Sequence, residues 1–565
     1  MSTDLLFEHF ATLATAPDGI ARLRELILQL AVQGKLGTQN AGDEPASVLL
    51  TTLKKEKALS IEKGIIRNSK ELAPILSDEI LYPIPEKWDW GIINDIGKNE
   101  QNAIVDGPFG SNLLKSEYIK EGGYPVITIS NLERGFDKKN IRFISKEKFE
   151  TLKRSAVKPG DIIMGKIGSC GKAGYYPESL PEGIIPANLL KVTVSEKVDK
   201  SFVFIFFNSR FFKYELNLIT KTTAQPAFGV TNFKQLFFPL PPLTEQHRIV
   251  AKVDRLMAIC DELEARQQQE RAGCLRLGTA SLAGLQNAES PEEFGRQWAQ
   301  VYEAFDLILD CPENVAVLQQ TILQLAVQGR LVRQEPGAEP TANLVGMIRQ
   351  EKERLVKEGK IKHEKPLKKI KEVQYKVPDG WQLCQLGEIS EIIMGNSPPG
   401  NTYNPYGDGV PLINGPTEFS KPPLGKTIVS QYTTQPTKFC KENDLLICVR
   451  GATTGRTNIA GFDACIGRGV AVIRSPSIQS YLNFFILTKA QQILDMGTGS
   501  TFPSISQNDL LTIPVPLPPL AEQNRIVAKV DALMALCDAL ESRLKERAGV
   551  QSKFTDAVVM KVGSE

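Results

Sequence analysis

The chain has few of the residues on which metal sites and disulfide frameworks depend. Its 565 residues include only three histidines, His9, His247 and His363, and its nine cysteines are scattered without a Cys-x-x-Cys pair. This pattern argues against a zinc site and against a secreted disulfide scaffold. It favours a reducing cytoplasm.

A large excess of charge and long apolar runs are also lacking. The 67 Lys and Arg residues nearly balance the 65 Asp and Glu residues, which leaves a net charge of only +2. A nucleic-acid reader with this charge would need local basic patches or phosphate contacts supplied by a partner. The N-terminus does not resemble a signal peptide, and the densest apolar stretch, 202–207, is too short to span a bilayer. The length of 565 residues predicts three or four domains. Because no signal peptide or membrane span is recognised, we expect them in the cytoplasm, without membrane association.

Two long segments of the chain repeat each other. Residues 239–266 read PLPPLTEQHRIVAKVDRLMAICDELEAR, and residues 516–543 read PLPPLAEQNRIVAKVDALMALCDALESR. They match without gaps at 22 of 28 positions, so the two segments are expected to share one structure.

A second repeat is out of phase with the first. The sequence ILQLAVQG occurs at 27–34 and again at 322–329. Two variable blocks, 84–238 and 377–515, lie between these repeated segments. The order predicts helical regions at 1–83, 239–376 and 516–565, so that the chain resembles a circularly permuted dimer.

Each long repeat predicts a helix that carries the apolar seam of a coiled coil. Apolar residues recur at alternating spacings of four and three. The seam residues are Ile249, Val253, Leu256, Cys260 and Leu263 in the first copy, and Ile526, Val530, Leu533, Cys537 and Leu540 in the second. Antiparallel pairing of the seams would relate the variable blocks by a pseudo-twofold axis. A helix over 243–271 would be about 43 Å long, which is close to the roughly 34–36 Å of one DNA turn. The alternative is that both are core helices of two unrelated bundles.

The variable blocks predict two α+β domains. Each block opens with Pro-x-x-Trp, at 85–88 and 378–381, and continues with short apolar runs between glycine, proline and asparagine turns. We expect strands near 124–129 and 160–164 in the first block, and near 409–413 and 443–450 in the second. Short helices near 201–218 and 480–494 complete the α+β pattern.

Polar residues in the glycine-rich loops of these blocks are candidate DNA readers. Glycines let the backbone approach a groove, while Arg, Lys and Asn supply base or phosphate contacts. The candidates are Ser111, Asn112, Lys115, Lys166, Ser169 and Lys172 in the first block, and Arg450, Thr453, Thr454, Arg456 and Arg468 in the second. The alternative for each is an ordinary solvated loop residue.

The charge of the two blocks differs. The first block has 22 basic and 17 acidic residues, a net of +5, whereas the second has 9 and 10, a net of −1. The second block is therefore expected to bind DNA weakly by itself and to depend on base-edge contacts or on partner phosphate contacts.

Three segments that resemble catalytic motifs lack essential parts of them. The loop from Gly165 to Lys172 is one residue longer than a phosphate-binding loop, and Ala173 stands where a magnesium-binding Ser or Thr is needed. Asn404-Pro405-Tyr406 lacks the second proline of an amino-methyltransferase box, and Pro378-Asp379 lies in a Pro-Asp-Gly turn without the spaced acid-x-Lys pair of a nuclease motif. With no zinc cluster or hydrolytic triad either, we expect a binding protein without metal or catalytic centre.

The duplicated phrase PLPPLxEQxRIVAKVDxLMAxCDxLE resembles the conserved helical regions of Type I restriction–modification specificity subunits. The segments 107–114 and 160–163 are similar to parts of their target-recognition domains, and ILQLAVQGKL is similar to subtypes with a conserved region before the first recognition domain. The resemblance covers nearly the whole chain.

This resemblance implies a function and a set of partners. Such a subunit binds double-stranded DNA together with two modification subunits, which use S-adenosylmethionine to methylate adenine, and two restriction subunits, which use ATP and Mg²⁺ to translocate and cleave. Each recognition domain reads one half of a bipartite target, and the long helices fix the spacer. Because the blocks differ, the target is expected to be asymmetric, in a system of phage defence. The other hypotheses are a stand-alone methyltransferase or nuclease with an unrecognised site, and a non-DNA scaffold.

Overall fold

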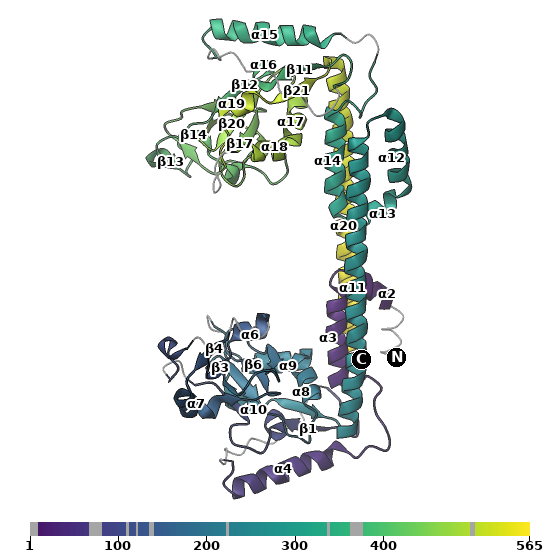
Figure 1. The fold of residues 1–565 in the computed structure, drawn as a ribbon, viewed down its shortest axis with the longest axis vertical. Coiled ribbons are helices and arrows are strands. Elements are labelled where there is room, and N and C mark those ends of the chain that lie inside the picture. The colour runs from purple at the N-terminus through teal and green to yellow at the C-terminus, as the bar shows by residue number, and fades with distance from the viewer. Residues whose placement is uncertain are drawn as a thin grey trace. The chain divides into compact units, whose positions relative to one another are not determined.

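The structure is a computed structural model. It describes residues 10–66, 82–108, 112–119, 122–134, 141–221, 225–335, 339–361, 377–497 and 503–564. The chain divides into two compact units, one of residues 1–268 with 547–565 and the other of residues 269–546. Each unit combines a set of helices with one α+β domain (Figure 1).

In unit 1, helix α3 packs against the first part of a long helix, α11. The hydrogen bonds join residues in reversed order, because Arg24 bonds Asp261 at 2.6 Å while Arg248 Nε donates to the Thr38 carbonyl at 2.9 Å, so the two helices are antiparallel. The end of a second long helix, α20, joins them, where Arg22 donates to the Ser552 carbonyl at 2.8 Å. The helices are α2 (Phe10–Thr15), α3 (Gly19–Val32), α4 (Ala46–Glu62), α11 (Leu243–Asn287) and α20 (Leu520–Ser564).

The first α+β domain is built on two four-stranded sheets, in the orders β2-β9-β6-β7 and β4-β3-β8-β5. A separate antiparallel pair, β1 with β10, joins the beginning and end of the domain. The strands are β1 (Asp89–Ile92), β2 (Ile104–Asp106), β3 (Tyr124–Val126), β4 (Arg142–Ile144), β5 (Ala156–Val157), β6 (Ile162–Gly165), β7 (Ala173–Tyr175), β8 (Gly183–Ile184), β9 (Leu189–Val192) and β10 (Phe237–Leu240).

Short helices cover these sheets and are capped in the ordinary way. Asp199 accepts from the Ser201 N–H at 2.8 Å at the start of α8, and Ser209 accepts from the Phe212 N–H at 3.2 Å at the start of α9. The helices are α5 (Ile93–Ile96), η3 (Lys115–Glu117), α6 (Ile129–Arg134), α7 (Lys146–Leu152), η5 (Lys153–Ser155), α8 (Lys200–Asn208), α9 (Arg210–Ile219) and α10 (Val230–Lys234).

The helices of unit 2 repeat those of unit 1. Helix α14 packs antiparallel to the first part of α20, since Gln319 bonds Asp538 at 3.1 Å while Arg525 bonds Glu335 at 3.0 Å. The end of α11 lies beside α14, where Gln286 bonds Thr321 at 2.8 Å. The other helices are α12 (Pro291–Glu303), α13 (Phe305–Leu309), α14 (Glu313–Val327) and α15 (Thr341–Lys357).

The second α+β domain has a four-stranded sheet, β12-β20-β17-β18, and a five-stranded sheet, β13-β15-β14-β19-β16, with β11 paired to β21. The elements are β11 (Gln382–Gln385), α16 (Leu386–Ile389), β12 (Glu391–Met394), η6 (Gly400–Thr402), β13 (Tyr403–Asn404), β14 (Val410–Ile413), η7 (Pro416–Glu418), β15 (Tyr432–Thr433), β16 (Phe439–Cys440), β17 (Leu445–Cys448), β18 (Thr457–Ile459), β19 (Ala464–Ile466), β20 (Val470–Arg474), α17 (Gln479–Thr488), α18 (Ala490–Asp495), α19 (Gln507–Leu511) and β21 (Pro514–Leu517).

The two domains therefore follow one topology, although their sequences show little identity. In both, the first sheet is wholly antiparallel and the second contains one parallel pair, β3 with β8 or β14 with β19. Strand β13 is the addition in the second domain. Each domain shares a large apolar core with the helices of its own unit, because Trp88 clusters with residues of α3 and α11, and Trp381 with residues of α14 and α20.

The long helices differ from the predicted 243–271 in one respect. Helix α11 continues to Asn287, because the extension contains no proline and its Leu282 and Leu285 are buried against Val301 and Ile308. The predicted strands near 160–164 and 443–450 correspond to β6 and β17, and the predicted short helices to the pairs α8–α9 and α17–α18. Helices α12 and α13 were not predicted.

Candidate functional site

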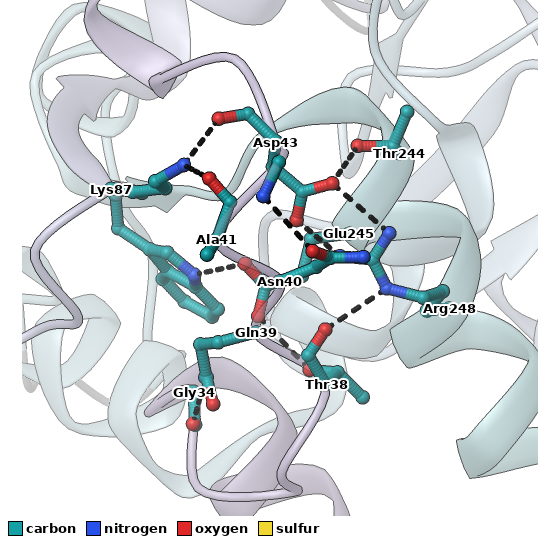
Figure 2. A network of polar contacts seen from close by, with 12 residues as sticks. Gly34, Thr38, Gln39, Asn40, Ala41, Asp43, Lys87, Thr244, Glu245 and Arg248 are labelled. Atoms are coloured by element: carbon teal, nitrogen blue, oxygen red, sulfur yellow. Dashed lines mark hydrogen bonds and ion pairs between the residues drawn. The ribbon is translucent and has the colours of Figure 1, made fainter.

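In unit 1, the start of α11 is bonded to the segment that follows α3, at Thr38 and Asp43, and to Trp88 at the beginning of the first domain. Figure 2 shows this junction. Glu245 is 1% exposed, and its carboxylate accepts from Thr38 Oγ1 at 3.0 Å and from Trp88 Nε1 at 2.9 Å. Arg248 pairs with Asp43, and this pairing lowers the pKa of the Asp43 carboxyl. The junction therefore fixes the domain to its helix through buried, charge-assisted bonds.

The corresponding junction of unit 2 has the same helix motif but fewer bonds. Glu522 occupies the position of Glu245 and is 3% exposed, and burial raises its pKa. Its Oε1 atom has no hydrogen-bond partner among the described residues. Arg525 pairs with Glu335 at 3.0 Å in place of the Arg248–Asp43 pair.

A glycine stands at the end of the short helix in both units. Gly34 follows α3 with φ 71°, and Gly329 follows α14 with φ 70°. A Cβ atom on Gly34 would lie 2.3 Å from Pro85, and one on Gly329 would lie 2.5 Å from Pro378. The last residue of ILQLAVQG thus both ends the helix and admits the proline of the Pro-x-x-Trp entry.

The second domain presents two arginines at one edge of its first sheet. Cys448 of β17 pairs with Val470 of β20, and the Val449 N–H donates to the Gly469 carbonyl at 2.9 Å. Arg450 follows β17 by two residues and bridges Ser504, and Arg468 lies in the turn before β20, where the Val470 N–H donates to the Gly467 carbonyl at 3.0 Å. Both arginines are exposed, and neither has an ion-pair partner among the described residues.

Asn414 lies beside this pair, at the end of β14. Its Oδ1 accepts from Ser397 Oγ at 3.3 Å, and the same hydroxyl accepts from the backbone N–H of Arg468 at 3.1 Å. The buried Glu418 carboxylate accepts from the Asn414 N–H at 3.1 Å and holds the loop. The edge therefore brings two cations and an oriented amide together.

The first domain forms the same edge with different side chains. Gly165 pairs with Leu189, and the Lys166 N–H donates to the Asn188 carbonyl at 2.8 Å, so Ile167 and Ala187 occupy the places of Arg450 and Arg468. Thr128 follows β3 as Asn414 follows β14, and its backbone N–H is held by Asn131 at 2.8 Å.

Close backbone packing supports this edge in both domains. A Cβ atom on Gly107 would lie 2.1 Å from the backbone of Pro186, and one on Gly395 would lie 2.2 Å from the Gly467 carbonyl oxygen. Both positions therefore require glycine, and the frame of the edge is shared even where its side chains are not.

The candidate readers of the first domain lie in different surroundings. Asn112 and Lys172 are exposed. Lys166 is half-buried and paired with Asp106, and Ser169 is half-buried in the loop between β6 and β7. Lys115 begins η3, and Ser111 lies outside the described residues.

In the second domain, only part of the candidate set faces solvent. Thr454 is 5% exposed and donates to the Gly451 carbonyl at 2.7 Å, so its hydroxyl stabilises the loop. Arg456 is half-buried and donates to the Ser420 carbonyl at 3.0 Å. Thr453 is half-buried, whereas Arg450 and Arg468 are exposed.

The seam residues lie in the cores of their own units. Those of α11 are buried or half-buried in a cluster that contains residues of α3 and the end of α20, and those of α20 lie in clusters with residues of α14. The fully buried members are Ile249, Val253 and Cys260 on α11 and Ile526, Val530 and Cys537 on α20, while Leu256, Leu263, Leu533 and Leu540 are half-buried.

Sequence reasoning missed Ser397, Asn414 and the bonds of the junction. Asn414 follows the predicted strand 409–413, which was a usable signal, but its link to Arg468 runs through Ser397 and depends on the pairing of β14 with β19. Among the described residues there is no group of three or more metal-binding side chains, and no helix is long and apolar enough to cross a membrane.

Comparison with known proteins assigns the family. The model of the Type I restriction modification DNA specificity domain matches residues 86–271 and 378–548. The chain is 30% identical over 578 residues to the Type I restriction enzyme EcoAI specificity subunit of Escherichia coli, covering 96% of this chain and 93% of the relative. It is 29% identical over 574 residues to the EcoEI specificity subunit of the same organism, with the same coverage. The chain belongs to the specificity subunits of Type I restriction–modification systems.

A solved structure supports the fold. A chain from work on "complex assembly and conformational transition of the type I R-M system" aligns with a TM-score of 0.50 at 22% identity, over 85% of this chain and 99% of the other. The predicted family is confirmed, and so is the α+β fold with two recognition domains in a pseudo-twofold repeat joined by long antiparallel helices.

Membership of this family sets the role of the chain. The specificity subunit is a DNA sequence-recognition subunit and not a catalytic one, and it associates with other subunits of the restriction–modification complex. Its family does not itself carry cofactors. The two α+β domains are therefore its recognition domains.

Proposed function

We propose that this specificity subunit reads an asymmetric bipartite DNA target, with one half-site for each recognition domain. The observation that carries the proposal is the shared edge of the two domains. The same strand ends present Arg450, Arg468 and Asn414 in one domain, but Ile167 and Ala187 with Thr128 in the other. Two domains that share the backbone of this edge but present different side chains there are suited to read two different half-sites.

Within this proposal, the DNA-facing residues are those of the candidate set that face solvent. Asn112, Lys172, Arg450 and Arg468 are exposed and so available to bases or phosphates. Lys166, Ser169 and Thr453 are half-buried beside them, and we keep Ser111 and Lys115 as candidates. We assign Thr454 and Arg456 to holding the loop, since their polar atoms bond backbone carbonyls.

We divide the chain into recognition domains at 84–238 and 377–515 and helical regions at 1–83, 239–376 and 516–565. Strands β10 and β21 extend two residues beyond these domain limits, and α11 and α20 begin three residues after the strands end. The seams of α11 and α20 would fix the length of the non-specific spacer.

The proposed partners are two modification subunits, which would carry S-adenosylmethionine, and two restriction subunits, which would use ATP and Mg²⁺. Exposed apolar side chains on the helices offer docking surfaces for the modification subunits, among them Trp298 at 53%, Tyr302 at 74% and Leu536 at 66% exposure. A role on DNA with these partners places the complex in the cytoplasm.

The proposal is tested by single-molecule sequencing of N6-methyladenine in host DNA, with and without the gene for this chain. Loss of one asymmetric bipartite motif on deletion is the expected result. If no motif changes while the chain co-purifies with an active methyltransferase, the proposed role is wrong. Binding of S-adenosylmethionine by the isolated chain would instead support a stand-alone methyltransferase, and failure of the assembled complex to retain DNA would support a scaffold.

A further inference from the structure

We propose that Arg450, Arg468 and Asn414 form the base-reading group of the second recognition domain, that this group contacts at least one guanine, and that Ser397 positions it. We call these four residues the edge cluster. The inference rests on the proposed function, and it adds the class of base that is read and the residues that read it.

The arginines of the second domain differ in whether a described residue pairs with them. Arg474 is bound by Asp444 and Glu391, and Arg456 by the Phe419 and Ser420 carbonyls. Arg450 and Arg468 are the two that remain, and no described residue pairs with either guanidinium. In a block of net charge −1, these two arginines lie at the same end of the β17–β20 pair, one just after β17 and the other in the turn just before β20.

Two guanidinium groups without protein acceptors at one end of a strand pair favour a ligand that offers acceptors. The face of a guanine in the major groove offers two acceptors, O6 and N7, in the spacing that one guanidinium fork matches. A phosphate would also pair with an arginine, but it would leave the oriented amide of Asn414 without a hydrogen-bond partner.

The position of Asn414 is fixed from two sides. Glu418 holds its backbone N–H, and Ser397 Oγ donates to its Oδ1 at 3.3 Å. Its Nδ2 atom has no bond to another described residue. An amide held in this way pre-organises a donor and an acceptor lone pair toward a base edge, since less side-chain freedom is lost on binding.

Ser397 links the amide to the arginine. Its single hydroxyl donates to Asn414 and accepts from the backbone N–H of Arg468 at 3.1 Å, so it fixes the Arg468 backbone relative to the Asn414 amide. Ser397 is therefore a positioning residue, and its loss is expected to weaken reading less than the loss of Arg468.

The test uses the assembled modification complex. Its binding is measured on the wild-type target and on targets in which each G·C pair of the second half-site is replaced in turn. R450A, R468A, N414A and S397A are compared with K441A, a matched loss of an exposed cation at the other end of β17. We expect R450A or R468A to lower discrimination at one G·C pair by roughly 10- to 100-fold, toward no preference. S397A should produce a smaller loss that S397T restores, and K441A should change nothing.

Thermal melting of each variant confirms that it is folded. Equal weakening on every sequence, with a reduced dependence on salt, would show phosphate contacts and overturn the proposal. So would an unchanged specificity in both arginine variants, or a wild-type second half-site without a G·C pair. If the wild-type complex reads no bipartite target at all, the proposed function itself is wrong, and that result is visible before any variant is made.

Discussion

The two units of the specificity subunit contain the same elements in the same order, but they hold them with different residues. Unit 1 fixes its recognition domain to α11 through Glu245, Thr38 and Trp88, whereas in unit 2 the matching Glu522 leaves one buried carboxylate oxygen without a described partner. The recognition edges differ in the same way, on one frame. Backbone topology and glycine positions therefore define the fold, while side chains at matching positions are free to diverge.

The largest expected difference concerns an aspartate that both domains share. Asp444 is held by Arg474 at 2.6 Å, whereas the matching Asp161 is held by Thr193 Oγ1 at 2.6 Å and, more loosely, by the buried Lys191 at 3.7 Å. Removing the half-buried Arg474 leaves the buried Asp444 carboxylate without its cation, so R474L should lower the free energy of unfolding by about 3–5 kcal/mol. T193V should lower it by only about 1 kcal/mol. Urea unfolding of both variants measures this, and equal losses would contradict it.

The junctions provide the next comparison. E245A leaves the Thr38 hydroxyl and the Trp88 indole N–H without their buried acceptor, so we expect a loss of about 2–4 kcal/mol. E522A removes a carboxylate that is poorly satisfied, and we expect about 1 kcal/mol or less. Differential scanning calorimetry of the two variants distinguishes them. A larger loss for E522A would show that the second junction is the stronger one.

Unit 1 also contains a buried carboxyl that unit 2 lacks. Burial raises the pKa of Glu215 on α9 to about 8, whereas Asp495 on the matching α18 is exposed. Because the folded pKa lies above the ordinary value of 4.5, the folded state binds the proton more tightly. The stability from this group is complete below about pH 4.5, falls as pH rises, and is lost above about pH 8.

Unit 1 should therefore lose about 2 kcal/mol of stability between pH 6 and pH 8. E215Q should remove this dependence, which unfolding curves at several pH values would reveal. D495N serves as the matched control and should leave the dependence intact. A wild-type stability that is constant from pH 6 to pH 8 would contradict the prediction.

The smallest expected effect is at the contact between each domain and one helix of its unit, α4 in unit 1 and α15 in unit 2. Lys197 bonds Glu56 of α4 in unit 1, but in unit 2 Ser477 and Glu351 line a cavity of about 480 Å³ beside α15. K197S should lower stability by about 0.5 kcal/mol, because both partners are partly exposed. S477K should raise stability by a similar amount in low salt. An effect of either variant that is independent of salt would contradict the ion-pair explanation.

Much of this architecture could be predicted from the sequence because it repeats. The offset of 277 between the long motifs placed α11 and α20, and the ILQLAVQG repeat placed α3 and α14. The extension of α11 to Asn287 was missed because its seam weakens at Gln267 and Glu270, and burial against α12 was not visible in the pattern.

The recognition edge was only partly predictable. Arg450 and Arg468 were identified by their glycine-rich loops, but their placement at one end of the same strand pair depends on the pairing of β17 with β20. Thr454 and Arg456 have the same local signature as Arg450, and only tertiary contacts distinguish a loop-holding residue from an exposed one.

The most direct test of the account replaces residues 382–517 with a second copy of residues 89–240, so that both units carry the first recognition domain. Single-molecule sequencing of N6-methyladenine is then performed in cells that contain the partner subunits. If each domain reads its own half-site through a shared frame, the methylated motif becomes an inverted repeat of the original first half-site. A motif that still contains the original second half-site would contradict this assignment.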